Sequence, residues 1–135
     1  MARILVIDDD KIFVDLMVGA LRDCGHDVTF AFEGHTGSKL AQSHIFDVVI
    51  CDLVMPEKEG LETIKDLRRD QPDLAILAVS GGLAMAPHID VLHIANKFGA
   101  DLTLCKPFKL RQLADAVDKV LVLRRAARRE RVHFA

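Results

Sequence analysis

Four short apolar runs in this sequence each end in polar side chains that could do chemistry. The runs lie at residues 4–7, 48–51, 75–79 and 102–105. Carboxylates follow the first two runs, a hydroxyl follows the third and an ammonium follows the fourth. In chain order these side chains are Asp8, Asp9, Asp10, Asp52, Ser80 and Lys106.

Carboxylates gathered at one place repel each other unless a cation lies among them, and Mg²⁺ prefers oxygen ligands of this kind. A metal alone would leave Ser80 and Lys106 without a role. A phosphoryl group has three oxygens, which a metal, an ammonium and a hydroxyl can hold together, so Asp52 becomes the natural nucleophile. Any single Asp or Ser at a strand end is more simply a turn or cap residue, but this explanation suits the whole set poorly.

The spacing of apolar residues predicts the elements that position these side chains. The four runs do not alternate with polar residues, which is typical of strands buried on both faces of a parallel sheet. A less regular stretch at 27–32 predicts a further strand at an edge. Segments with helical spacing follow the strands; they cover about 13–24, 35–43, 61–68, 87–99 and 110–121.

Five repeats of strand then helix predict an α/β fold with a doubly wound, five-stranded parallel sheet. Gly25, Pro72 and Gly99 are expected to end the first, third and fourth helices. In such a sheet, the functional crevice lies at the carboxyl ends of the strands, where the polar side chains occur.

Four motifs resemble those of response regulator receiver domains. They are ILVIDDD at 4–10, VVICDLVMPEKEG at 48–60, ILAVSGG at 76–82 and LTLCKPF at 102–108. The resemblance covers a receiver domain at 2–123 and leaves a basic C-terminal tail at 124–135. It implies the flavodoxin-like receiver fold with strand order 2-1-3-4-5.

The resemblance also implies a function in two-component signalling. Asp52 would accept a phosphoryl group from a histidine kinase or a histidine phosphotransfer protein in a Mg²⁺-dependent reaction. The single-domain regulator would then signal by phosphorylation-dependent protein binding, and its downstream target is not identified by the sequence. Such a domain is a phosphoacceptor rather than an enzyme in the ordinary sense, although it can catalyse its own phosphorylation and dephosphorylation.

Residue by residue, the resemblance implies that Asp9, Asp52 and the Val54 carbonyl bind Mg²⁺ directly, while Asp8 acts through water. Mn²⁺ is the alternative ion. Asp10 lies one place beyond the acid pair of the family, so we expect it to cap the first helix.

The same resemblance places Lys106 and Ser80 on phosphoryl oxygens, with the backbone amides of Val54 and Gly81 completing the cradle. Pro107 is expected to follow a cis peptide bond, which would turn Lys106 into the site.

The sequence departs from the family pattern at the switch. Many relatives carry Tyr or Phe three places before the lysine, and this chain has Thr103. We therefore expect phosphorylation to act through Ser80 and the loop at 81–87. Val54 and Gly82 cannot place an attacking water through side-chain hydrogen bonds, which leaves the phosphoryl lifetime open.

Two alternatives stay open at this point. A haloacid-dehalogenase-like phosphatase also uses an aspartyl phosphate, and Asp8-x-Asp10 mimics its opening motif, but the chain is short for that class and no acidic pair follows Lys106. A receiver-shaped adaptor would bind partners regardless of phosphorylation.

Composition sets further expectations. The net charge of −2 divides into +4 for residues 124–135 and −6 for the rest, so a general nucleic-acid surface is not expected and the tail should be solvated. No apolar run or signal-peptide layout suggests a membrane, which favours a cytoplasmic protein. A homodimer is compatible with the sequence. Cys24, Cys51 and Cys105 lack metal or disulfide spacing and are interpreted as small core residues.

Overall fold

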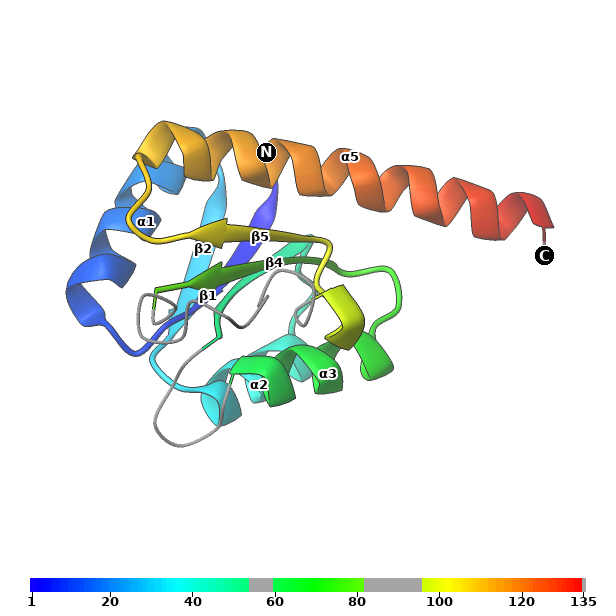
Figure 1. The fold of residues 1–135 in the computed structure, drawn as a ribbon, viewed down its shortest axis with the longest axis horizontal. Coiled ribbons are helices and arrows are strands. Elements are labelled where there is room, and N and C mark those ends of the chain that lie inside the picture. The colour runs from blue at the N-terminus through cyan, green and yellow to red at the C-terminus, as the bar shows by residue number, and fades with distance from the viewer. Residues whose placement is uncertain (54–59, 82–95, 135) are drawn as a thin grey trace, which may run out of the picture.

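The structure is a computed structural model, and it describes residues 1–53, 60–81 and 96–134. Five parallel strands form one sheet in the order β2-β1-β3-β4-β5 (Figure 1), so the predicted sheet and its strand order are confirmed. The strands are β1 (Arg3–Ile7), β2 (Asp27–Ala31), β3 (Val48–Asp52), β4 (Ala75–Ser80) and β5 (Leu102–Cys105). The helices are α1 (Lys11–Asp23), α2 (Gly34–Ser43), α3 (Gly60–Asp70) and α5 (Leu110–Phe134).

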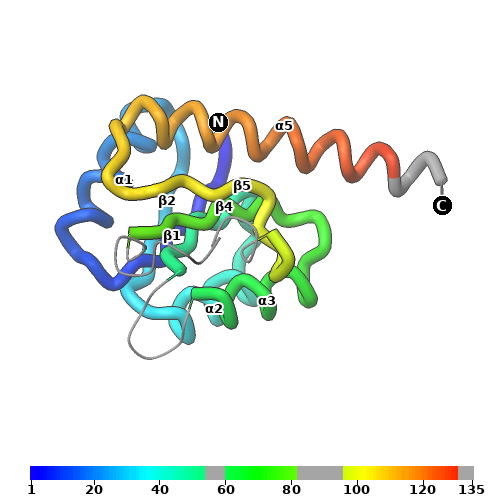
Figure 2. The backbone as a smooth tube through the Cα atoms, in the orientation of Figure 1, coloured from blue at the N-terminus to red at the C-terminus, as the bar shows by residue number. Residues whose placement is uncertain are grey.

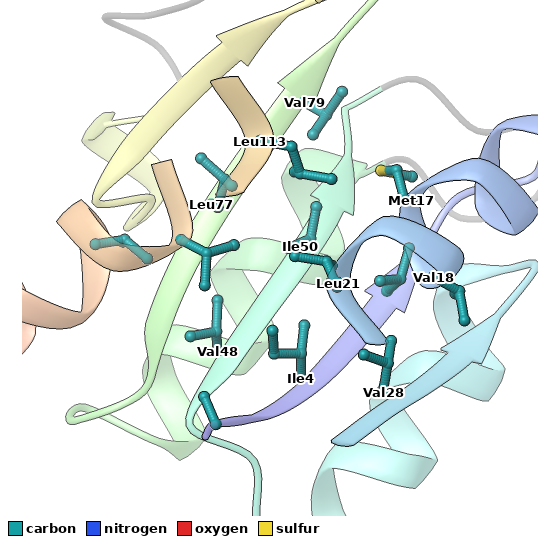
Figure 3. Close-up of a cluster of buried hydrophobic side chains, with 14 of the residues drawn as sticks. Ile4, Met17, Val18, Leu21, Val28, Val48, Ile50, Leu77, Val79 and Leu113 are labelled. Atoms are coloured by element: carbon teal, nitrogen blue, oxygen red, sulfur yellow. The ribbon is translucent and has the colours of Figure 1, made fainter. Parts of the chain in front are cut away.

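Helices cover both faces of the sheet, with α1 and α5 on one face and α2 and α3 on the other (Figure 1). Alternate residues of each central strand serve the two layers. Ile4 and Val6 join the core beneath α1 and α5, whereas Leu5 and Ile7 join the core beneath α2 and α3. Figure 3 shows Ile4 in the first of these cores. This use of both faces explains why residues 4–7, 48–51 and 75–79 of the central strands are all apolar.

The two edges of the sheet are less buried than its centre. Every residue of β3 and β4 is buried, whereas β2 buries only Val28 and Ala31 and β5 is only partly covered. The prediction of an edge strand near residues 27–32 is confirmed. The prediction that 102–105 is buried on both faces is wrong, because β5 pairs with β4 on one side only and forms the opposite edge.

Local signals at the helix ends were predicted correctly where the structure describes them. The Asp10 side chain accepts a hydrogen bond from the Phe13 amide at 3.1 Å and so caps α1. Gly25, just past α1, has φ +89°, a conformation that glycine adopts without strain. The start of the predicted fourth helix lies outside the described residues. Its last turn is helical at 96–98, and Gly99 follows with φ +117°.

The last helix continues through the basic segment and projects beyond the sheet (Figures 1 and 2). Its first half packs on the core through Leu113, Val117 and Val120. The helix passes residue 123 without a break, so a domain boundary at that point stays a prediction.

Arg124 corrects the expectation of a solvated tail. Its side chain is 19% exposed, and its Nε lies 2.9 Å from Oδ1 of Asp101, although this N–H is not aligned for a hydrogen bond. Its Nη1 donates to the Pro72 carbonyl at 3.1 Å. Asp101 also pairs with Arg68 at 2.9 Å, so one carboxylate ties α5 to α3. The other described arginines of the tail, Arg125, Arg128 and Arg129, are exposed as expected.

The cysteines divide between core and surface. Cys51 is buried in β3, as expected, but Cys24 and Cys105 are exposed. Cys24 follows the last turn of α1 and Cys105 ends the edge strand, so neither position is covered on all sides. Among the described helices, none combines the length and the apolar character that a membrane span requires.

Candidate functional site

The side chains singled out in the sequence meet at the carboxyl edge of the sheet. The parallel register places Asp52 opposite Val79 and Ser80 opposite Cys105, so neighbouring strands end at the same rim. Asp8, Asp52 and Ser80 are 1%, 6% and 2% exposed. Asp9 is exposed. Buried ionisable groups that gather at one edge of a sheet occur mainly at functional sites, so this rim has the character of a binding site.

Three carboxylates form a cluster that could hold a metal ion. Asp8, Asp9 and Asp52 each offer an oxygen, and these oxygens all lie within 4.8 Å of one another. With one ammonium nearby, the four groups carry a formal charge of −2, which a divalent cation would neutralise. The all-oxygen donor set fits Mg²⁺ or Mn²⁺.

Asp8 is already engaged through both of its oxygens. Oδ1 accepts a hydrogen bond from the Asp10 amide at 3.0 Å, and Oδ2 accepts one from Lys106 Nζ at 2.9 Å. Its carboxylate therefore has less freedom to bind a metal directly than the exposed carboxylate of Asp9. This arrangement is compatible with the indirect role expected for Asp8.

Lys106 extends from the end of β5 across the rim. Its ammonium lies 2.9 Å from Asp8 Oδ2, 3.8 Å from Asp52 Oδ2 and 4.2 Å from the centre of the Phe13 ring. Its methylene stem passes close to Gly81, where an added Cβ would lie 2.8 Å from Lys106 Cδ. The Lys106–Pro107 peptide bond is cis, the isomer that the resemblance implies.

Ser80 lies beside the exposed thiol of Cys105. Its Oγ donates to Cys105 Sγ at 3.6 Å, and its carbonyl accepts from the Lys106 amide at 2.8 Å. Sulfur is a weak acceptor, so this bond leaves the hydroxyl easy to redirect. Thr103 is partly buried on β5 opposite Ala78.

Gly60 lets the chain return close to the end of β3. Its amide donates to the Leu53 carbonyl at 3.1 Å, and an added Cβ would overlap the carbonyl oxygen of Asp52. Only glycine permits this approach, so the first turn of α3 lies directly against the end of β3.

Two parts of the expected site lie outside the described residues. They are Val54, expected to supply a carbonyl and an amide, and residues 82–87 of the loop that is expected to carry the switch together with Ser80.

Sequence reasoning missed two neighbours of the site. Phe13 begins the first predicted helical segment without any expected role in the site, and Cys105 is interpreted from the sequence as a core residue. Phe13 lies four residues after Asp9, in the first turn of a helix that begins at the rim, and this position could have indicated a contact with the site. Cys105 adjoins the lysine, but its contact with Ser80 depends on the register of β4 and β5.

Comparisons with known proteins define the class. The family profile of the response regulator receiver domain matches residues 4–118, and the chain belongs to this family. The response regulator receiver protein CpdR of Brucella abortus is 33% identical over 124 residues, which cover 90% of this chain and 98% of that protein.

The transcriptional regulatory protein ZraR of Salmonella typhimurium is 30% identical over 118 residues, covering 87% of this chain but only 26% of ZraR. This chain therefore spans about a quarter of such a regulator. A solved receiver domain from Clostridium thermocellum superposes with a TM-score of 0.84 at 26% identity, covering 94% of this chain and 99% of that one.

Proposed function

We propose that this receiver domain accepts a phosphoryl group on Asp52 from a histidine kinase or a histidine phosphotransfer protein, in a reaction that requires Mg²⁺. The observation that carries the proposal is the convergence of Asp8, Asp9 and Asp52 within 4.8 Å, with the ammonium of Lys106 lying 3.8 Å from Asp52. A nucleophilic carboxylate and a cation for the incoming phosphoryl group thus occur together.

In the proposed reaction, a carboxylate oxygen of Asp52 forms a bond to phosphorus while the bond from phosphorus to the donor imidazole breaks. The leaving imidazole takes up a proton. Lys106 would hold one phosphoryl oxygen through its ammonium, and Ser80 would turn its hydroxyl from Cys105 toward another. The burial of Asp52 and Ser80 excludes water from these contacts and strengthens them.

Asp9 and Asp52, with Val54, are the residues that we propose as direct ligands of the metal. When bound, Mg²⁺ or Mn²⁺ would supply positive charge to the transferring oxygens. Asp8 would bind the metal indirectly, through water, because its carboxylate already accepts hydrogen bonds from Lys106 and the Asp10 amide.

The test is stoichiometric phosphorylation by acetyl phosphate with Mg²⁺, followed by intact mass. The unmodified protein should gain one phosphoryl group and Asp52→Asn none. Asp27→Asn, a change at an exposed aspartate that begins β2, should behave like the unmodified protein. Phosphorylation of the Asp52→Asn protein would contradict the assignment of Asp52 as phosphoacceptor. If the protein with its native sequence gains no phosphoryl group, a phosphorylation-independent adaptor is favoured.

The metal is tested by calorimetric titration with MgCl₂, which suits a chain without Trp or Tyr. Asp9→Ala should weaken binding strongly, because it removes one of few anionic ligands. Asp10→Asn is the matched control, since Asp10 is an adjacent exposed aspartate that caps α1. Equal Mg²⁺ affinity in Asp9→Ala and the unmodified protein would overturn the ligand assignment.

We further propose that phosphorylation acts through Ser80 and the 81–87 loop, because Thr103 is too small to replace a switch aromatic. Beryllofluoride, a phosphoryl mimic, should then change amide exchange most at residues 80–95. Thr103→Ala should alter this response little. Changes confined to Asp8, Asp9 and Asp52 would contradict this route.

A further inference from the structure

Lys106 has an unusual neighbour in the ring of Phe13. The ammonium lies 4.2 Å from the ring centre, well inside the roughly 6 Å over which a cation is attracted to an aromatic face. The lysine side chain is 19% exposed, so the attraction is only partly screened by water. The contact joins α1 to the residue that follows β5.

The ring of Phe13 is held in place from two directions. Its backbone amide donates to the capping carboxylate of Asp10 at 3.1 Å, which fixes the first turn of α1. Its ring meets that of Phe108 edge to face, with centres 5.2 Å apart and planes inclined at 75°. Both rings are partly buried against the core beneath α1 and α5. Phe13 therefore presents a fixed surface to Lys106.

The ring of Phe13 holds the Lys106 ammonium in a different way from Asp8. Asp8 accepts a charged hydrogen bond from one N–H of the ammonium at 2.9 Å, and this bond competes with a phosphoryl oxygen for the position of the lysine head group. A ring face attracts the cation without occupying any of its N–H groups. The ammonium can therefore exchange Asp8 for a phosphoryl oxygen while it stays over the ring.

We propose that Phe13 is a positioning residue for phosphoryl transfer, and that its ring face keeps the ammonium of Lys106 over the carboxylate cluster as Lys106 changes partner. This inference rests on the proposed phosphorylation of Asp52. It assigns to α1 an aromatic contribution to the site, in a chain whose β5 carries Thr103 where many relatives have a ring.

A second contact between a lysine and a phenylalanine ring provides a control. Lys11 lies over the ring of Phe32 at 5.3 Å, at a surface position where Phe32 is 37% exposed. Phe32→Leu therefore removes a ring from a lysine without touching Lys106. Phe13→Tyr keeps the aromatic face, and Phe13→Leu keeps apolar bulk while removing it.

The experiment measures the rate constant of phosphorylation by acetyl phosphate with saturating Mg²⁺. Phe13→Leu should lower it by about 3- to 30-fold, the range that corresponds to losing a partly desolvated cation–π contact. Phe13→Tyr should restore the rate to within about twofold, and Phe32→Leu should leave it unchanged. In a Lys106→Met background, Phe13→Leu should have no further effect, because the cation is gone.

Each failure has a distinct signature. Phosphorylation of Asp52→Asn, or no phosphorylation of the unmodified protein, contradicts the proposed function itself. An unchanged rate in Phe13→Leu, or an equal loss in the Lys106→Met background, overturns only the role of Phe13. If Phe13→Leu does not fold, NMR of the unmodified protein decides, since the methylene protons of Lys106 must show the upfield ring-current shift. Its absence would overturn the inference.

Discussion

The carboxylates and the lysine of the candidate site come from strands with different surroundings. Asp8 directly follows β1 and Asp52 ends β3, and the inner residues of these two strands are covered on both faces of the sheet and flanked by strands on both sides. Lys106 follows β5, an edge strand whose residues are only partly covered. Asp8 and Asp52, the buried acidic half of the site, are thus fixed by the core, whereas the basic half depends on a few contacts of one side chain.

This difference suits the proposed chemistry. A nucleophile and metal ligands must stay in place, because misplacement of reacting groups by about 1 Å can cost about a hundredfold in rate. The cation has to exchange Asp8 for a phosphoryl oxygen, so partial freedom at the edge is useful. Phe13, Asp8 and the stem contact with Gly81 limit that freedom.

Alanine substitutions at two glycines should give the largest difference in stability between the central strand β3 and the edge of the sheet. In Gly60→Ala, the new Cβ meets the backbone of Asp52 and Leu53, which cannot move without disturbing β3. In Gly81→Ala, the new Cβ meets the flexible stem of Lys106. We expect Gly60→Ala to cost about 4 kcal/mol or more of unfolding free energy, and Gly81→Ala less than about 1 kcal/mol.

Urea unfolding monitored by circular dichroism measures both changes. Gly19→Ala is the control for the method, because nothing lies within 4 Å of its new Cβ and alanine favours the α1 helix. It should stabilise the protein by about 0.5–1 kcal/mol. A smaller loss in Gly60→Ala than in Gly81→Ala would contradict the contrast.

Truncating one apolar residue in a central strand and one in an edge strand should give a smaller difference in unfolding free energy. Ile50 in β3 is 1% exposed and lies in the core beneath α1 and α5 (Figure 3). Leu104 in β5 packs against the same core but is only partly buried. Ile50→Ala should cost about 3–5 kcal/mol and Leu104→Ala about 1–2 kcal/mol, because a cavity at an edge can collapse or admit water. Equal midpoints in urea would show that β5 is fixed as firmly as β3.

The sequence predicted what depends on local pattern and missed what depends on strand order. The Asp10 cap, the Gly25 stop and the polar strand ends are all visible in neighbouring residues. The run at 102–105 is apolar except for Thr103, and nothing within it shows that one side faces no further strand. Arg124 reads as a solvated charge until the fold brings Asp101 beside it. Phe13 and Lys106 likewise meet only because α1 begins and β5 ends at one rim.

Thiol labelling of the cysteines tests the same difference between β3 and β5 with the smallest expected effect on stability. Cys51 lies in β3 at 0% exposure, whereas Cys105 lies at the end of β5 and is exposed. Thiol reagents attack the accessible thiolate, so burial protects Cys51 under native conditions. Cys24 after α1 serves as the exposed reference. Native protein should take up two labels, on Cys24 and Cys105, and urea-unfolded protein should take up three.

Peptide mass spectrometry assigns the labels, and Cys24→Ser and Cys105→Ser each remove one. The Cys105 thiol accepts a hydrogen bond from the Ser80 hydroxyl at 3.6 Å, so a label on Cys105 should also slow the phosphorylation of Asp52. A label on Cys24 should leave this rate unchanged. If Cys51 reacts as fast as Cys105 in native protein, β3 opens as readily as the edge. The distinction between a fixed acidic half and an adjustable basic half would then fail.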